Sequence, residues 1–430
     1  MITTAFINIW NQRVGAIAWD SDTGLGSFEY EPSFLKTNWN IAPIKMPIEG
    51  AEKRIFSFSE LRDIKTFKGL PGLLADVLPD KYGNALINTW LAHQGRASDS
   101  LNPVEILCFI GGRGMGALEI EPANPKTSNT ATKIEIGNLI DIAEAILSGK
   151  KDFRTKLKPN EEKALLDILK IGSSAGGARA KAVIAYNPKT HQVRSGQADA
   201  PKGFTHWLIK FDGVTDKQLG AASGYGRVEM AYNLMARDAD IEMTECRLLE
   251  EKGRAHFMTR RFDRRPMNGK VHVQSFCALR HYDFNEINLY SYEQLFETMR
   301  LLGLPYPQAE QLYRRMVFNV MARNCDDHTK NFAFVMNKTG SWKLSPAYDI
   351  CHAYQPNHKW VDQHALSING KRKNITKTDL IEVARKMNVK KAETIIKQIA
   401  DIISNWKKYA RKENVDNKLA EAIWKTLIIL

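Results

Sequence analysis

The stretch DDHTKN, residues 326–331, is followed by PAYDI, residues 346–350. An aspartate, an asparagine five residues later and a second aspartate 18 residues beyond that follow the order of a phosphotransferase catalytic loop. In that chemistry the first aspartate orients or deprotonates the acceptor hydroxyl, and the other two residues hold the magnesium that bridges the ATP phosphates. The stretch therefore predicts Asp326 as the base and Asn331 and Asp349 as magnesium ligands.

The surroundings of this loop support the prediction more than the motif alone. An apolar helix at 313–323 leads into the loop and an apolar strand at 332–336 leaves it. A hairpin turn then returns the chain along 342–344 toward Asp349. The alternative is a set of solvated loop carboxylates, which would not need this order of elements.

Two other side chains of the loop are candidates for the same site. His328 is expected to hold the loop by hydrogen bonds and is counted with the nucleotide-binding residues. Lys330 either neutralises the γ-phosphate, as a catalytic residue would, or is simply solvated.

Candidates for nucleotide binding lie upstream. The glycine-rich stretch 172–177 would let backbone N–H groups approach phosphate oxygens, although glycine-rich turns are common. Lys210 ends a predicted strand at 205–211, where it either pairs with the α- and β-phosphates or extends to solvent. Glu229, on a predicted helix at 227–239, is placed to hold that lysine or is a solvated helix residue.

Asp263 follows a predicted strand at 256–262. A carboxylate at the end of such a strand can accept hydrogen bonds from a ribose. The alternative is an ordinary ion pair with one of the flanking arginines, Arg260, Arg261, Arg264 and Arg265.

Composition excludes some classes of protein and leaves others open. The 430 residues are 43% hydrophobic and 25% charged, as in folded proteins built from two or three subdomains. We expect no transmembrane helix, no signal peptide and no disulfide framework from the five scattered cysteines, which together suggest the cytoplasm. The net charge is +13, and residues 371–430 hold 15 Lys/Arg against 7 Asp/Glu. That basic region is either a solvated helical face or a surface for nucleic acid.

Hydrophobic periodicity predicts further elements. A hairpin is expected at 5–19 with its turn at Asn11-Gln12, and helices are expected at 70–95 and 136–147. A last helix carries an apolar stripe that should belong to the core: Ile395, Ile396, Ile399, Ile402, Ile403 and Trp406.

The order of motifs along nearly the whole chain resembles the HipA family, bacterial serine/threonine kinases that act as toxins of toxin–antitoxin pairs. The similar segments are WNQRVG at 10–15, VLPD at 77–80, IGGRGMGA at 110–117, SAGGARAK at 174–181, THWLIK at 205–210, RFDR at 261–264, DDHTKN at 326–331 and YDI at 348–350.

The resemblance implies a role for each candidate. Asp326 would be the base, Asn331 and Asp349 the magnesium ligands, Lys210 the ATP lysine and Asp263 a ribose contact. The loop Ser174, Ala175, Gly176, Gly177 and Ala178 would cradle phosphate. Ser174 would also be an inhibitory autophosphorylation site, with the adjacent Ser173 as an alternative.

The resemblance also implies partners. The family acts on proteins that include aminoacyl-tRNA synthetases, and a DNA-binding antitoxin of the HipB type restrains it. Contact with DNA would then come through the antitoxin. This chain departs from the family pattern at Asp327, which replaces a glycine and is expected to add negative charge beside the anionic ATP.

The sequence thus predicts an α+β, protein-kinase-like fold of two lobes with an N-terminal accessory subdomain. The expected regions are the accessory subdomain at 1–130, a β-rich lobe at 131–265 and a helical lobe with the catalytic loop at 266–430. Two other functions remain open. One is a small-molecule or lipid kinase, and the other is a catalytically degenerate kinase that binds protein or nucleic acid.

Overall fold

A computed structural model describes residues 2–122, 136–147, 169, 179–196, 199–216, 220–221 and 224–430. The chain divides into two compact units. The first unit comprises residues 1–38, 48–226 and 246–272, and the second comprises 39–47, 227–245 and 273–430. The regions predicted at 1–130, 131–265 and 266–430 stay predictions, because the two units divide the chain differently.

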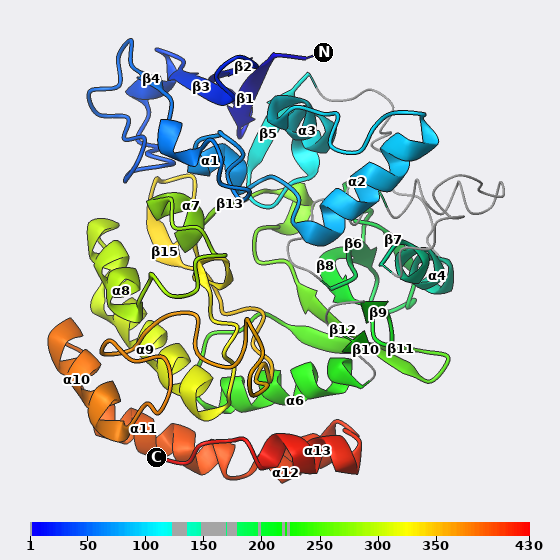
Figure 1. Ribbon diagram of the computed structural model, residues 1–430, viewed down its shortest axis with the longest axis vertical. Coiled ribbons are helices and arrows are strands. Elements are labelled where there is room, and N and C mark those ends of the chain that lie inside the picture. The colour runs from blue at the N-terminus through cyan, green and yellow to red at the C-terminus, as the bar shows by residue number, and fades with distance from the viewer. Residues whose placement is uncertain are drawn as a thin grey trace. The chain divides into compact units, whose positions relative to one another are not determined.

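The first unit begins with a five-stranded antiparallel sheet of order β4-β3-β2-β1-β5 (Figure 1). The strands are β1 (Thr4–Ile9), β2 (Gln12–Asp20), β3 (Leu25–Tyr30), β4 (Ile55–Phe56) and β5 (Leu118–Glu121). The predicted hairpin is confirmed, but its turn lies one residue earlier than expected. Trp10 and Asn11 both have positive φ, 49° and 66°, as a two-residue hairpin turn that matches the strand twist requires.

Helices of the first unit are α1 (Gly72–Ala75), α2 (Lys81–His93), α3 (Pro103–Ile110) and α4 (Ile136–Leu147). Helices at 70–95 and 136–147 were predicted, and α4 has the predicted bounds. The α3 helix was missed. Its start has clear local signals, because Asn102 and Glu105 form a reciprocal capping box and Pro103 occupies the first helical position.

A second antiparallel sheet of the first unit has the order β11-β12-β8-β6-β7. Its strands are β6 (Lys181–Tyr186), β7 (Val193–Ser195), β8 (Thr205–Lys210), β11 (Cys246–Glu251) and β12 (Arg254–Arg260). Two short strands, β9 (Thr215–Asp216) and β10 (Gly220–Ala221), pair separately. The central strands β6 and β8 run antiparallel, so Lys181 lies directly opposite Lys210.

The second unit is mostly helical. The helices, several of which Figure 1 shows around α9, are α7 (Phe276–Arg280), α8 (Tyr292–Leu301), α9 (Tyr306–Met321), α10 (Lys377–Met387), α11 (Ala392–Ile403), α12 (Trp406–Lys412) and α13 (Asn417–Trp424). The α6 helix (Tyr225–Asp238) contributes to its core from residue 227 onward. β13 (His272–Ser275), β14 (Ala333–Met336) and β15 (Trp342–Leu344) form a three-stranded sheet.

One hydrophobic core joins these helices. The isoleucine stripe of α11 is confirmed as part of it, because Ile395, Ile396, Ile399 and Ile403 are all buried. α9 packs on α11 and is buried along its last three turns. This packing fixes the end of α9, from which the predicted catalytic loop directly follows. Within the described ranges, no helix is both long and apolar enough to cross a membrane.

Candidate functional site

The loop after α9 is tied to the segment that follows Asp349. The backbone N–H of Cys325 donates to the carbonyl of Ala353 at 3.0 Å, and the N–H of Ala353 donates to the carbonyl of Arg323 at 3.0 Å. These bonds form a parallel bridge between Asn324 and Ala353. The two stretches that the sequence analysis linked by spacing are therefore adjacent in the second unit.

Burial alternates along this loop. Cys325, Asp327 and Thr329 are buried, whereas Asp326 and His328 are partly exposed. In an extended segment successive side chains point to opposite sides, so the odd-numbered residues anchor the loop and the even-numbered ones face outward. The side chain of Asp326 is 48% exposed, as a residue that must meet an acceptor requires.

Short hydrogen bonds shape the outward face. The Asn331 Nδ2 donates to the carbonyl of Asp326 at 2.6 Å, and the Asn331 N–H donates to the carbonyl of His328 at 2.9 Å. His328 Nε2 lies 3.8 Å from Asp326 Oδ1. The hydroxyl of Tyr348 donates to the carbonyl of Lys330 at 2.7 Å. His328 thus lies beside the expected base.

The two expected magnesium ligands come together. Asn331 and Asp349 line one small cavity in the second unit. Asp349 has a positive φ of 56°, which is uncommon for a residue with a side chain and is often found at functional sites. Carboxylate and amide oxygens suit Mg²⁺, which usually takes one or two carboxylates together with water and substrate phosphates. The donor set therefore fits the predicted metal.

Asp327, which was expected to add negative charge beside ATP, is buried, and it lines the same small cavity as Asn331 and Asp349. Oδ2 accepts from the Tyr292 hydroxyl at 2.8 Å and lies 2.8 Å from His364 Nδ1, and Oδ1 accepts from the Ala365 N–H at 2.7 Å. We call Asp327 and His364 the Asp327–His364 pair. The negative charge is compensated inside the protein.

The Asp327–His364 pair should make stability depend on pH. Burial disfavours the imidazolium, but the charge and hydrogen bond of Asp327 outweigh this and raise the pKa of His364 from 6.5 to about 10. A raised folded-state pKa gives stability that is complete below pH 6.5 and is lost as the pH rises toward about 10. We expect the free energy of unfolding to fall over this range by on the order of a few kcal/mol.

Urea titrations of the full chain across that pH range would measure the loss, with His364→Gln as the control that should show a flatter dependence. A parent protein whose urea midpoint is constant over this range would contradict the assignment.

Lys210 and its surroundings lie in the first unit. Lys210 ends β8, and its ammonium is 5.8 Å from the ring centroid of Phe257 on β12. On the other side β6 places the buried Lys181 opposite it. Like charges at directly opposed sheet positions repel, which makes an anionic partner favourable there. Sequence reasoning missed Lys181, although it ends the quoted segment at 174–181.

Other nucleotide-binding predictions remain predictions. Glu229 is buried on α6 in the second unit, whereas Lys210 belongs to the first unit, so their pairing stays a prediction. The loop residues Ser173, Ser174, Ala175, Gly176, Gly177 and Ala178 lie outside the described residues.

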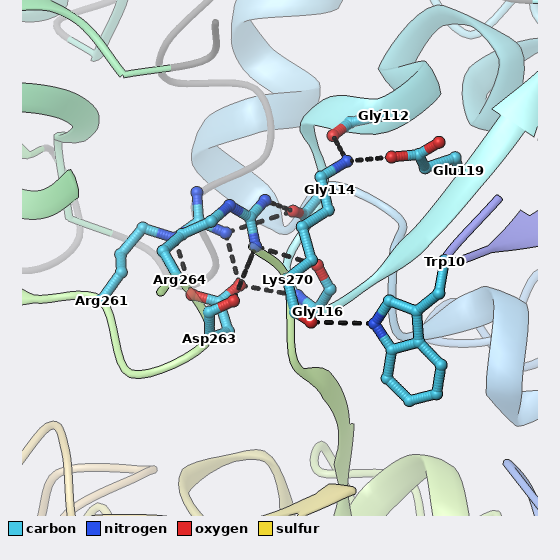
Figure 2. Close-up of polar contacts among 9 residues, drawn as sticks. All are labelled: Trp10, Gly112, Gly114, Gly116, Glu119, Arg261, Asp263, Arg264 and Lys270. Carbon is cyan, nitrogen blue, oxygen red and sulfur yellow. Dashed lines mark hydrogen bonds and ion pairs between the residues drawn. The ribbon is translucent and has the colours of Figure 1, made fainter. Parts of the chain in front are cut away.

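Of the two alternatives for Asp263, the structure shows the ion pair with flanking arginines. Its side chain is fully buried, and it lies between Arg261 and Arg264 (Figure 2). Arg261 approaches it at 2.6 Å and Arg264 at 2.7 Å, and the N–H of Gly116 donates to Oδ2 at 2.8 Å. No surface of Asp263 is left for a ribose hydroxyl in this arrangement. We therefore assign Asp263 a structural role in place of the ribose contact.

The arginine–aspartate cluster (Arg261, Asp263 and Arg264) binds the loop before β5. Arg261 and Arg264 donate to the carbonyl of Gly114 at 3.2 and 3.0 Å, and Arg264 also donates to the carbonyl of Gly116 at 2.9 Å. Gly116 has a φ of 81°, a left-handed conformation that favours glycine. The glycines of the segment at 110–117 therefore have a packing function.

Lys270 extends the same connection (Figure 2). Its ammonium donates to the carbonyl of Gly112 at 2.9 Å and to Glu119 at 2.5 Å, and its carbonyl accepts from the Trp10 indole at 2.8 Å.

Burial would raise the pKa of Asp263, but Arg261, Arg264 and the Gly116 N–H hold that pKa well below its usual range. The carboxylate is thus charged at all moderate pH values.

Comparisons with known proteins agree with this architecture. Residues 5–121 match the model of the HipA N-terminal domain, and residues 173–406 match the model of the HipA-like C-terminal domain. The HipA chain in the solved complex of Shewanella oneidensis MR-1 HipA, HipB and operator DNA has a TM-score of 0.69. That match has 16% sequence identity and covers 97% of this chain and 94% of that one.

Two relatives from Sinorhizobium fredii (strain NBRC 101917 / NGR234) carry provisional kinase names. Y4dM is 27% identical over 198 residues, which span 42% of this chain and 46% of that protein. Y4mE is 24% identical over 376 residues, which span 81% of this chain and 77% of that protein. The α+β fold class and the resemblance stated from the sequence are confirmed, and the chain belongs to the HipA family.

Proposed function

We propose that this protein is an ATP-dependent serine/threonine protein kinase of the HipA toxin type. The observation that carries the proposal is the arrangement in the second unit, where Asn331 and Asp349 line one cavity and the Asn331 amide bonds the carbonyl of the partly exposed Asp326. Kinase chemistry needs little more than positioning and charge neutralisation, and these residues can supply both. Membership in the HipA family and the kinase names of the two relatives support the same reaction.

In the proposed reaction the acceptor hydroxyl oxygen attacks the γ-phosphorus of ATP. The bond from that phosphorus to the bridging oxygen breaks and ADP leaves, while the hydroxyl proton passes to the Asp326 carboxylate. Asn331 and Asp349 would hold Mg²⁺, which would neutralise charge on the phosphates.

Two lysines have separate roles in this proposal. Lys210 would contact the α- and β-phosphates, with Glu229 as its carboxylate partner. Lys330, whose ammonium is 5.0 Å from the Phe284 ring centroid, would neutralise the γ-phosphate.

The acceptors and the partner are proposed from the family. One acceptor would be a serine of the chain's own loop, Ser174 or Ser173. A phosphoserine there adds about −1.5 to −2 charges and should displace the loop from the bound phosphates. Another acceptor would be a cellular protein, for which an aminoacyl-tRNA synthetase is the family's example. The solved Shewanella complex supports a HipB-type antitoxin as the partner, and contact with DNA would come through that antitoxin.

The test is incubation of the full chain with Mg·ATP labelled at the γ-phosphate, followed by mapping of the label by mass spectrometry. We expect label on the loop serines, with Ser174→Ala and Ser173→Ala deciding between them. A dephosphorylated sample that neither binds Mg·ATP nor transfers label to itself or to a protein mixture would refute the proposal. Label transferred only to a lipid or metabolite would favour the other kinase class.

A further inference from the structure

We propose that the Asp327–His364 pair positions the catalytic base, so that His364 is a positioning residue for phosphoryl transfer. This inference rests on the proposed function. His364 lies 38 residues after Asp326 and is fully buried, so it cannot touch ATP or the acceptor. Its effect would pass through Asp327, the next residue after the base.

The geometry of the loop carries the inference. Asp326 and Asp327 share a peptide bond and point to opposite sides, one outward and one into the core. A displacement of the Asp327 backbone would therefore change the direction of the Asp326 side chain. Three groups hold that carboxylate within 2.8 Å: the Tyr292 hydroxyl, His364 Nδ1 and the Ala365 N–H.

The pair is anchored on both sides. On one side the Tyr292 hydroxyl accepts from Asn319 Nδ2 at 3.0 Å, and Asn319 Oδ1 accepts from Asn324 Nδ2 at 2.9 Å. These residues belong to α8, to α9 and to the start of the loop. Buried polar groups thus link the start of the loop, at Asn324, to Asp327. A fully satisfied network of this kind specifies one conformation.

On the other side His364 is held by its own segment. The backbone N–H of His364 donates to the carbonyl of Arg372 at 3.1 Å, and Cys325 Sγ lies 3.9 Å from the ring Nε2 of His364. Arg372 in turn donates to the carbonyls of Ala365 and Tyr290. His364 therefore connects the loop to a turn that Arg372 also ties to Tyr290.

Two other contacts that hold the loop involve uncharged groups only, unlike the Asp327–His364 pair. The Thr329 hydroxyl donates to the carbonyl of Tyr282 at 2.9 Å, and Cys325 is held through its backbone. The Asp327–His364 pair is a charged contact at a site buried from water, where a lone charge would be strongly disfavoured. Changing either partner alone should move the loop, and changing both together should disturb it less.

The first test compares His364→Gln, Asp327→Asn and the double variant in the full chain. We expect each single variant to lower kcat by about 10- to 100-fold, because small displacements of a reacting group have effects of that size. In His364→Gln the KM for Mg·ATP should stay nearly unchanged, because Lys210, Asn331 and Asp349 are intact and His364 does not line their cavity. The double variant should regain part of the lost kcat, as coupled residues do.

Ile399→Ala is the control for a purely structural effect. Ile399 is buried in α11, so this variant should lower the melting temperature while the folded enzyme keeps its kcat. Rates are compared well below each melting temperature. Single variants that behave like Ile399→Ala, with lower melting temperature but parental kcat, would overturn the inference.

A second measurement separates this inference from the proposed function. Hydrogen exchange followed by mass spectrometry reports the opening of the loop peptide at 325–332 whether or not the chain is an active kinase. Faster exchange confined to this loop and its partner segment in His364→Gln supports the positioning role. Unchanged exchange there overturns it, even in an active enzyme. Absence of phosphoryl transfer by the parent chain would instead count against the proposed function.

Discussion

Asp326→Asn is expected to lower the rate of phosphoryl transfer by about 10³-fold or more while Mg·ATP still binds. The amide keeps the shape of the side chain and cannot accept the proton of the acceptor hydroxyl. The surrounding bonds should survive, because Asn331 holds the backbone carbonyl of Asp326 rather than its carboxylate. Initial rates with γ-labelled ATP and calorimetric titration with Mg·ATP would measure the two effects separately.

Two matched substitutions make this prediction specific. Asp349→Asn changes a proposed metal ligand, so it should weaken the dependence on Mg²⁺ as well as the rate. Asp401→Asn changes an exposed carboxylate on α11 and should leave both quantities at the parental value. Parental activity in Asp326→Asn would show that the base lies elsewhere.

Asp263→Ala should cause the largest loss of stability, about 3–5 kcal/mol in the free energy of unfolding. The change leaves the nearly buried side chains of Arg261 and Arg264 without their carboxylate partner and removes the acceptor of the Gly116 N–H. The loss should appear first as detachment of the loop before β5, because three of its backbone groups bind the cluster. Urea unfolding and limited proteolysis of the full chain would measure it.

The expected pH dependence of the stability contributed by Asp263 agrees with its structural role. Folding lowers the pKa of Asp263, so its stabilisation is present above the ordinary carboxyl pKa of 3.8 and is lost only in stronger acid. Asp199→Asn, an exposed carboxylate of the same unit, is the matched control and should be near parental in stability. A stable Asp263→Ala protein that had lost its affinity for ATP would instead restore the ribose contact predicted from sequence.

The arginine–aspartate cluster also explains how the two matched family regions are joined. Gly114 and Gly116 lie in the region of the N-terminal model, and Arg261, Asp263 and Arg264 lie in that of the C-terminal model. All five of these residues belong to the first compact unit. The RFDR segment is therefore a junction between them.

Much of the site was readable from local sequence. Spacing and the order of the surrounding elements brought Asp326, Asn331 and Asp349 into one hypothesis, and the structure places the last two on one cavity. Apolar periodicity also predicted the α4 and α11 helices, because apolar residues recur at every third or fourth position on the buried face of a helix. These features depend on neighbours within one turn, one hairpin or one loop.

Partners that are distant in the chain were decided by the tertiary structure. For Asp263 the sequence left open a ribose contact or an arginine pair, and the fold places it with Arg261, Arg264 and the N–H of Gly116, 147 residues away. The sequence places Asp327 beside the predicted base and shows no link to His364, whose Nδ1 the fold brings to 2.8 Å from the Asp327 carboxylate. The physical reason is that burial and charge compensation depend on which segments pack together. The sequence alone determined which chemistry the catalytic loop could carry, whereas only the packing decided which carboxylate faces outward and which ones hold the fold.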